Sequence, residues 1–199
     1  MSTDAALQKR VLRRELRRVL CSISPEARQV ASRQAWGRLS AQIAWQRART
    51  VFLYWSMSSE LDTQPMIESA LLHQKTVALP RFNPAVGEYE PVQVKDLAAD
   101  LRPGRLGILE PRAHCPPVEP IRLDFSLVPG LGFALNGRRL GRGKGFYDRM
   151  LTRVGGLKCG LAFDEQVVEG IPWEPHDVCV DCLLTPARWW VVHPRPVLE

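Results

Sequence analysis

The sequence predicts an α/β protein with a mostly parallel sheet that helices cover on both faces. Helical patterns alternate along the chain with short apolar runs, as in chains that form parallel sheets. Runs such as 51–55 and 125–128 are almost entirely apolar, which is typical of strands buried on both faces. A glycine-rich segment, 141–148, follows the second of these runs, and ligands of such sheets bind beyond the carboxyl ends of the strands.

Four segments have helical patterns. Apolar residues recur at helical spacing between Leu7 and Leu20, which predicts an amphipathic helix with a strongly basic outer face. Ser24 and Pro25 have the residue types of an N-cap and a first helical position, so we expect a helix from there to about residue 46. Two further helices are expected at 63–73 and 146–153.

The remaining apolar runs predict strands. Residues 76–79 read as a strand that Pro80 ends, and 89–94 as an edge strand, because Pro91 cannot donate to a central ladder. Residues 101–120 are rich in proline, glycine and arginine and are expected to form an ordered loop. Other expected strands lie at 51–55, 124–128, 157–163, 178–184 and 189–192. We see no repeat, so a single domain spanning 1–199 is expected.

Composition excludes several classes of protein. The 199 residues are 45% hydrophobic and 24% charged, as in ordinary globular proteins, and no apolar run reaches the length of a membrane-spanning helix. The amino-terminal residues lack the apolar core of a secretory signal, so a cytoplasmic location is expected. Five scattered cysteines suit reduced thiols rather than disulfides. Cys179 and Cys182 have CxxC spacing but no companion ligands, so metal or redox use is not expected.

The net charge of +6 is concentrated near the amino terminus, where residues 9–18 contain six basic residues and one acidic residue. Three explanations stay open on charge alone: a solvated helix face, contact with nucleic acid, or contact with phosphate. Lys9 and Arg13 are four residues apart and therefore lie on one helix face, as joint contact with one polyphosphate requires.

The segment 141–148, Gly-Arg-Gly-Lys-Gly-Phe-Tyr-Asp, has the parts of a phosphate site. Alternate glycines let the backbone approach an anion, and Arg142 and Lys144 add positive charge. Asp148 follows where a magnesium ligand could lie. The spacing fits neither of the common nucleotide loops, GxxxxGK[ST] and GxGxxG. The alternative is a glycine-rich hairpin with solvated basic residues.

With its flanking segments, this stretch resembles the 5-formyltetrahydrofolate cyclo-ligase family, also called methenyltetrahydrofolate synthetases. The resemblance is carried by 136–148, by Pro-Gly-Leu-Gly-Phe at 129–133, and by 161–166 and 177–181 downstream. Residues 9–13 and 56–60 stand where that family has its other ligand-binding stretches, so the resemblance covers roughly 9–186. It implies a fold like that of NagB, RpiA and the CoA transferases, with ATP as co-substrate, Mg²⁺ as cofactor and no nucleic-acid or membrane partner in a monomeric enzyme.

The resemblance also implies roles for individual residues. Arg142, Lys144 and Tyr147 would be catalytic, with Lys144 on the β- and γ-phosphates and Arg142 nearest the transferring group. Asp148 and Asp181 would hold magnesium. ATP would be bound by Lys9, Arg13, Arg139, Gly141, Arg142, Gly143, Lys144, Gly145 and Tyr147. The folate would be bound by Trp55, Glu60, Arg142 and Phe146.

Departures from the family pattern leave alternatives open. Phe146 stands where many members have tyrosine, and Leu106 stands roughly where vertebrate members have a tryptophan against the pterin, so folate affinity is in doubt. From the residues alone, Asp181 could be an ordinary strand-end aspartate and Trp55 a core residue. Two other functions stay open: ATP-dependent activation of a different amide or carboxylate, and an RNA-binding or accessory role for the basic segments.

Overall fold

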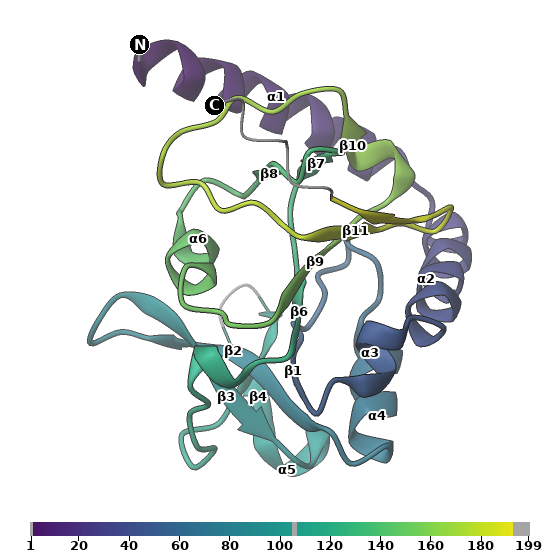
Figure 1. Cartoon of the computed structure of the whole chain (residues 1–199), viewed down its shortest axis with the longest axis vertical. Coiled ribbons are helices and arrows are strands. Elements are labelled where there is room, and N and C mark those ends of the chain that lie inside the picture. Colours follow the sequence, from purple (N-terminus) through teal and green to yellow (C-terminus); the bar gives the residue numbers. More distant parts are fainter. Residues whose placement is uncertain (1, 105–106, 193–199) are drawn as a thin grey trace, which may run out of the picture.

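The computed structural model describes residues 2–104 and 107–192, which form a central sheet of seven strands in the order β12-β11-β9-β6-β1-β2-β3 (Figure 1). The five inner strands are parallel, and β3 and β12 pair antiparallel at the two edges. The prediction of a mostly parallel sheet is therefore confirmed. The strands are β1 (Thr50–Phe52), β2 (Thr76–Asn83), β3 (Glu88–Val94), β6 (Phe125–Val128), β9 (Leu157–Leu161), β11 (Cys182–Leu184) and β12 (Trp189–Val191).

Helices cover both faces of this sheet, as expected. Because side chains alternate along a strand, Val51 and Leu53 of the β1 segment enter one apolar cluster and Phe52 enters the other. The first cluster is closed by one group of helices and the second by a single short helix (Figure 1). The group consists of α2 (Pro25–Ser40), α3 (Ile43–Arg47) and α4 (Gln64–Leu72), and the single helix is α6 (Phe146–Leu151).

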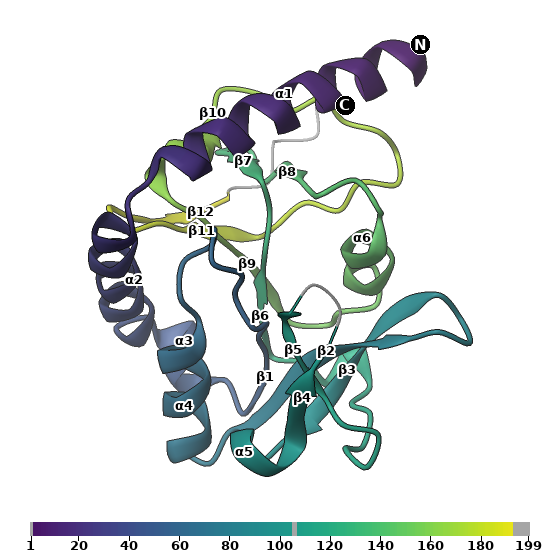
Figure 2. The same cartoon turned by 180° about the vertical axis from the view of Figure 1, so that it is seen from behind.

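The amino-terminal helix α1 (Ser2–Ser22) crosses one end of the molecule, over a small sheet in the order β10-β7-β8 (Figure 2). Leu16 and Leu20 are buried, and Leu16 packs in one cluster with Leu140 of this small sheet. Most basic side chains of α1 are thereby left exposed, whereas Lys9 is buried. The strands are β7 (Gly132–Ala134), β8 (Arg139–Leu140) and β10 (Val167–Val168).

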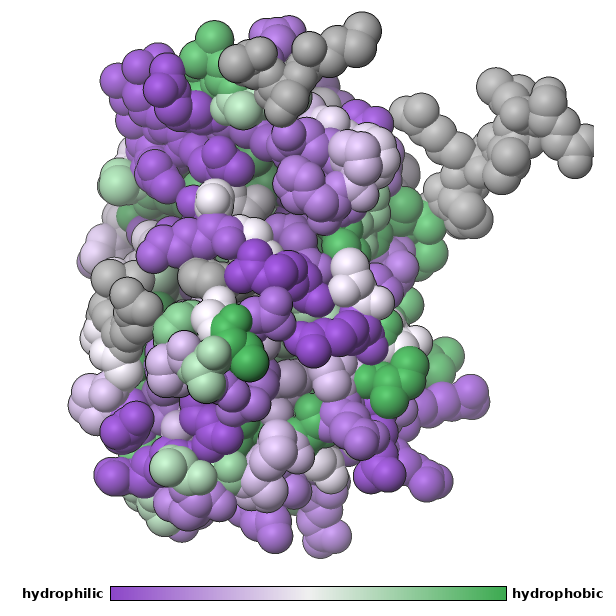
Figure 3. Space-filling model, turned by 90° about the vertical axis from the view of Figure 1, so that its left-hand side faces the viewer, coloured by the Kyte–Doolittle hydropathy of each residue, from purple (hydrophilic) through white to green (hydrophobic). Residues whose placement is uncertain are grey.

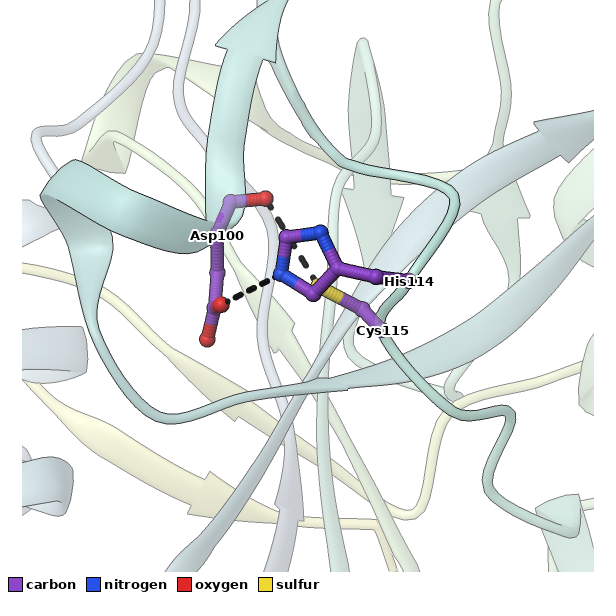
Figure 4. Close-up of side chains that lie close together, drawn as sticks. All are labelled: Asp100, His114 and Cys115. Carbon is purple, nitrogen blue, oxygen red and sulfur yellow. Dashed lines mark hydrogen bonds and ion pairs between the residues drawn. The ribbon is translucent and has the colours of Figure 1, made fainter.

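A hairpin of β4 (Leu101–Pro103) and β5 (Leu109–Pro111) follows the one-turn helix α5 (Leu97–Asp100). Its two ends are joined by Asp100, His114 and Cys115 (Figure 4). The Asp100 Oδ1 atom lies 2.9 Å from His114 Nε2, while Oδ2 accepts the backbone amides of Lys95 and Asp96. These bonds, first that from Lys95, lower the pKa of Asp100 to about 2. A carboxylate, an imidazole and a thiol, all possible metal ligands, lie close together here, but a structural zinc site needs four ligands. We therefore interpret this group as a clasp, a set of contacts that holds the two ends of the hairpin together.

Ion pairs fasten α6 to the outer end of the β2–β3 hairpin. Arg149 and Arg153 lie 3.0 and 3.4 Å from the carboxylate of Glu88 at the start of β3. This side of the molecule is turned toward the viewer in Figure 3, where hydrophilic residues cover most of the surface and hydrophobic ones form small separate areas. Within the described residues, no helix is long and apolar enough to cross a membrane.

Three element predictions were wrong in detail. Pro80 does not end its strand: β2 continues to Asn83, because Pro80 lies opposite Pro91 of the edge strand, where neither amide is needed. The helix that begins at Ser24 stops at Ser40 and resumes as α3, since Gln42 adopts an extended backbone. The expected loop at 101–120 contains the β4–β5 hairpin. The single-domain assignment and the likeness to NagB stay predictions.

Candidate active site

A cavity of about 400 Å³ opens at the carboxyl ends of β1 and β6, where the fold predicted a ligand site. Tyr54 and Trp55, which follow β1, form one wall, and Pro129 and Gly130, which follow β6, form another. The glycine-rich segment 141–145 lies across the opening and contributes its backbone and basic side chains. The alternative of a merely solvated glycine hairpin is therefore not favoured by the structure.

Two glycines of this segment, Gly143 and Gly145, adopt backbone conformations that side chains disfavour. Gly143 has φ +105° and Gly145 has φ +64°, and Gly145 directly precedes the first residue of α6. Lys144, between them, is exposed and lines the cavity. The segment thus bends its backbone and a lysine around the cavity opening, as a phosphate-binding loop must.

Arg139 supports this loop from below. Its side chain is buried, and its Nη2 atom donates to Asp148 Oδ1 at 2.6 Å while Nη1 donates to the carbonyl of Pro129 at 3.1 Å. A Cβ atom added at Gly141 would lie 3.1 Å from Arg139 Nη1, so the loop backbone rests on the guanidinium. Arg139 therefore fixes both the loop and the first turn of α6, and its charge faces the cavity.

Arg142 and Glu60 both line the cavity and form an ion pair there. Arg142 Nη2 lies 2.6 Å from Glu60 Oε1, and Glu60 Oε2 accepts the backbone amide of Met57. Glu60 is nearly buried, whereas the Arg142 side chain is 38% exposed and can leave the pair for a ligand. Sequence reasoning assigned Glu60 to the folate and Arg142 to both substrates, and the structure brings the two side chains into contact.

Much of the cavity lining is apolar or aromatic. Tyr147, one of these lining residues, lies near Phe52, with ring centroids 6.3 Å apart. Burial, and then the negative charge of Glu60, raises the pKa of Tyr147, so its phenol is a neutral hydrogen-bond donor. A flat ring with edge donors would find an apolar wall and one carboxylate here. The apolar and aromatic lining consists of Tyr54, Trp55, Met57, Pro80, Tyr89, Ile108, Leu109, Pro129 and Tyr147.

The two basic residues predicted on α1 have different environments. Arg13 Nε donates to the carbonyl of Gly141 at 2.9 Å, so Arg13 touches the loop, and its expected contact with ATP stays a prediction. Burial and the neighbouring charge of Arg17 lower the pKa of Arg13. Lys9 is instead buried on the acidic side chains of Glu174 and Asp177, at 2.8 and 2.5 Å. In this structure Lys9 fastens the 172–178 segment to α1 rather than lining the cavity.

The predicted pair of magnesium carboxylates is not brought together. Asp148 lines the cavity, but Asp181 lies before β11, where its carboxylate accepts the amide of Lys158 at the amino end of β9. The cavity is at the opposite, carboxyl ends of the strands, so the strand-end interpretation of Asp181 fits this geometry. The side chain of Phe146 and all of Leu106 lie outside the described residues.

Sequence reasoning missed several cavity residues. Ile108, Leu109 and Glu110 come from the unpredicted hairpin. Pro80 comes from β2 and Tyr89 from β3. Their signal in the sequence is weak, because a hairpin that reaches over a distant strand end leaves no periodic pattern.

A model of the 5-formyltetrahydrofolate cyclo-ligase family matches residues 5–186 of this chain. The 5-formyltetrahydrofolate cyclo-ligase of Escherichia coli strain K12 is 36% identical, over 85% of this chain and 95% of that protein. The protein of the same name from Mus musculus is 31% identical, over 88% and 92%. The NMR structure of 5,10-methenyltetrahydrofolate synthetase from Aquifex aeolicus superposes with a TM-score of 0.85 at 34% identity and covers 96% of each chain.

Proposed function

This chain belongs to the 5-formyltetrahydrofolate cyclo-ligase family, and from that premise we propose that it converts 5-formyltetrahydrofolate to 5,10-methenyltetrahydrofolate with cleavage of ATP to ADP and phosphate. The observation that carries the proposal is that one cavity is lined both by apolar and aromatic side chains and by the basic side chains of Arg139, Arg142 and Lys144, with Arg142 2.6 Å from Glu60. A pterin and a polyphosphate need these two environments side by side.

The chemistry explains why the pterin and the polyphosphate must lie side by side. A formamide carbonyl is a poor electrophile, because nitrogen donation stabilises it and its oxygen is a bad leaving group. In the proposed reaction the formyl oxygen attacks the γ-phosphorus and ADP leaves. N10 then attacks the activated carbon, its proton is lost, and departure of phosphate leaves the methenyl bridge.

The residues of this chain supply position and charge for that sequence. Glu60, held by the Met57 amide, would accept N–H groups of the pterin, and Trp55 would pack on its ring. Arg142, released from Glu60, would reach the transferring phosphoryl group, with Lys144 on the β- and γ-phosphates. Tyr147 would donate a hydrogen bond from its neutral phenol, and Arg139 would keep the loop in place.

Magnesium fits this site only in part. Asp148 is the one proposed ligand that lines the cavity, and its Oδ1 atom is already paired with Arg139. One carboxylate is enough for an ion that takes its other ligands from phosphates and water, and its chemistry would be to neutralise phosphate charge. We therefore propose Asp148, without Asp181, as the protein ligand of the metal in the ATP complex.

The test is the absorbance of the methenyl product after the protein is mixed with 5-formyltetrahydrofolate, MgATP and buffer. We expect a rise that depends on ATP, that is lost in Lys144→Ala, and that persists in Lys95→Ala, an exposed lysine outside the cavity. No rise with folded wild-type protein would refute the proposal and favour another amide or carboxylate as the acceptor. The expected cytoplasmic location and monomeric state stay predictions, and size-exclusion chromatography tests the latter.

A further inference from the structure

We propose that Arg17, together with Arg13, forms an oxyanion-binding subsite on α1 at the rim of the cavity. The subsite takes a phosphate of the nucleotide or a carboxylate of the folate's glutamate tail. The proposal deepens the function proposed above and rests on it. Arg17 was not among the site residues expected from the sequence.

The position of Arg17 is fixed by the helix that carries it. Positions 13 and 17 are one turn apart and project from the same side of α1. Leu16 and Leu20, the neighbours of Arg17 on the inner face, are 4% and 3% exposed, and a Cβ atom at Gly132 would meet Leu16 Cδ1 at 2.6 Å. The helix is therefore packed tightly against the core, and Arg17 lines the cavity from a rigid support.

The other guanidinium groups at the cavity have acceptors within the protein. Arg13 donates to the Gly141 carbonyl, Arg139 to Asp148, and Arg142 to Glu60. The side chain of Arg17 makes no hydrogen bond or ion pair with any residue that the structure describes. Arg13, one turn away, carries a like charge that interacts with that of Arg17.

Two guanidinium groups on one face repel each other, and an oxyanion between them reverses the sign of that interaction. Arginine presents paired N–H donors that match the oxygens of phosphate and carboxylate. Both candidate ligands carry such a group into the proposed reaction. The net positive charge of the rim thus has a chemical use that a solvated helix face would not have.

Arg18 is the matched control. It is the next residue on the same helix, it is exposed, and it does not line the cavity. Arg17→Ala and Arg18→Ala remove the same side chain from neighbouring positions, so an effect on helix propensity or net charge appears in both. Thermal unfolding monitored by circular dichroism verifies that both variants are folded.

Binding of ATP to the folate-free protein is measured by titration calorimetry, and KM is measured for 5-formyltetrahydrofolate with and without its glutamate. We expect Arg17→Ala to weaken the binding of one ligand, measured as ATP affinity or as KM for the folate, by about tenfold, as loss of a charge-assisted bond predicts. The same two quantities should stay within about twofold of wild type in Arg18→Ala. Weaker ATP binding identifies the phosphate as the ligand. A raised KM confined to the glutamate-bearing folate identifies the carboxylate.

Equal behaviour of Arg17→Ala and Arg18→Ala toward both ligands would overturn the subsite. This outcome differs from failure of the proposed function, in which wild-type protein forms no methenyl product. In that case the calorimetric comparison with ATP still decides whether Arg17 binds a phosphate.

Discussion

Replacing Arg139 by methionine tests whether this buried arginine holds the loop and α6 together. The change removes the 2.6 Å bond to Asp148 and the 3.1 Å bond to the Pro129 carbonyl. Among the described residues, the carboxylate of Asp148, 16% exposed, then keeps only a long 3.5 Å contact to the amide of Val178. Breaking a buried pair in this way costs about 3–5 kcal/mol. Methionine also removes the Arg139 Nε atom, which is buried without a partner among the described residues. Removing this unpaired donor offsets about 1 kcal/mol of the cost of breaking the pair.

We therefore expect Arg139→Met to lower the free energy of unfolding by about 2–4 kcal/mol, a loss that a domain of ordinary stability survives. The assay is urea unfolding of wild type, Arg139→Met, Asp148→Asn and the double variant. The asparagine of Asp148→Asn is neutral, so removing Arg139 in the double variant leaves no unpaired buried charge. The double variant should therefore be more stable, by at least about 1 kcal/mol, than the sum of the two single losses predicts. A loss below about 1 kcal/mol in Arg139→Met, or strict additivity in the double variant, would refute the reasoning.

Three further predictions concern other parts of the molecule. Glu60→Gln should raise KM for the folate by about tenfold and leave calorimetric ATP binding within about twofold of wild type. A loss of ATP binding in this variant would count against the assignment of Glu60 to the folate alone. Gly143→Ala, at φ +105°, should weaken ATP binding by about tenfold or more, whereas Gly37→Ala, in the open face of α2, should leave binding unchanged and raise stability by about 0.5–1 kcal/mol. Asp100→Asn should cost stability at neutral pH. The amide of Lys95 and then His114 depress the folded pKa of Asp100 from 3.8 to about 2. In urea unfolding, the stability difference between wild type and Asp100→Asn should therefore be full above pH 3.8 and should narrow as the pH falls toward 2. A stability difference that does not change with pH would contradict these bonds to the carboxylate.

The regular parts of the fold were predictable because each follows from local chemistry. Ser24 caps α2 as expected, with its side chain accepting the amide of Ala27. The buried strands 125–128 and 157–161 were found from apolar composition alone. The end of β2 was not predictable at Pro80, because the cost of a proline in a strand depends on whether its nitrogen faces a hydrogen-bond partner. Its pairing with Pro91 is a long-range contact that the local sequence does not show.

For the site, the glycine loop was found from its own residues and Glu60 through the resemblance, and both lie at the cavity. Asp181 was assigned in the same way, but its strand register places it at the other end of the sheet. Motif spacing records which residues are near in sequence, whereas the end of a strand at which a residue lies is decided by the path of the chain. Arg17 and Ile108 enter the cavity for the same reason, without a motif to mark them.

The contacts of α1 also impose an order on how the protein can mature on the ribosome. This helix is synthesised first, yet Lys9 reaches Asp177 across 168 positions and Arg13 reaches Gly141 across 128. The amphipathic helix must therefore wait, with its apolar face uncovered, until nearly the whole polypeptide has emerged. Nascent chains that stop before Glu174 would carry a cationic helix without its acidic anchor, so we expect them to depend on chaperones and to bind no nucleotide.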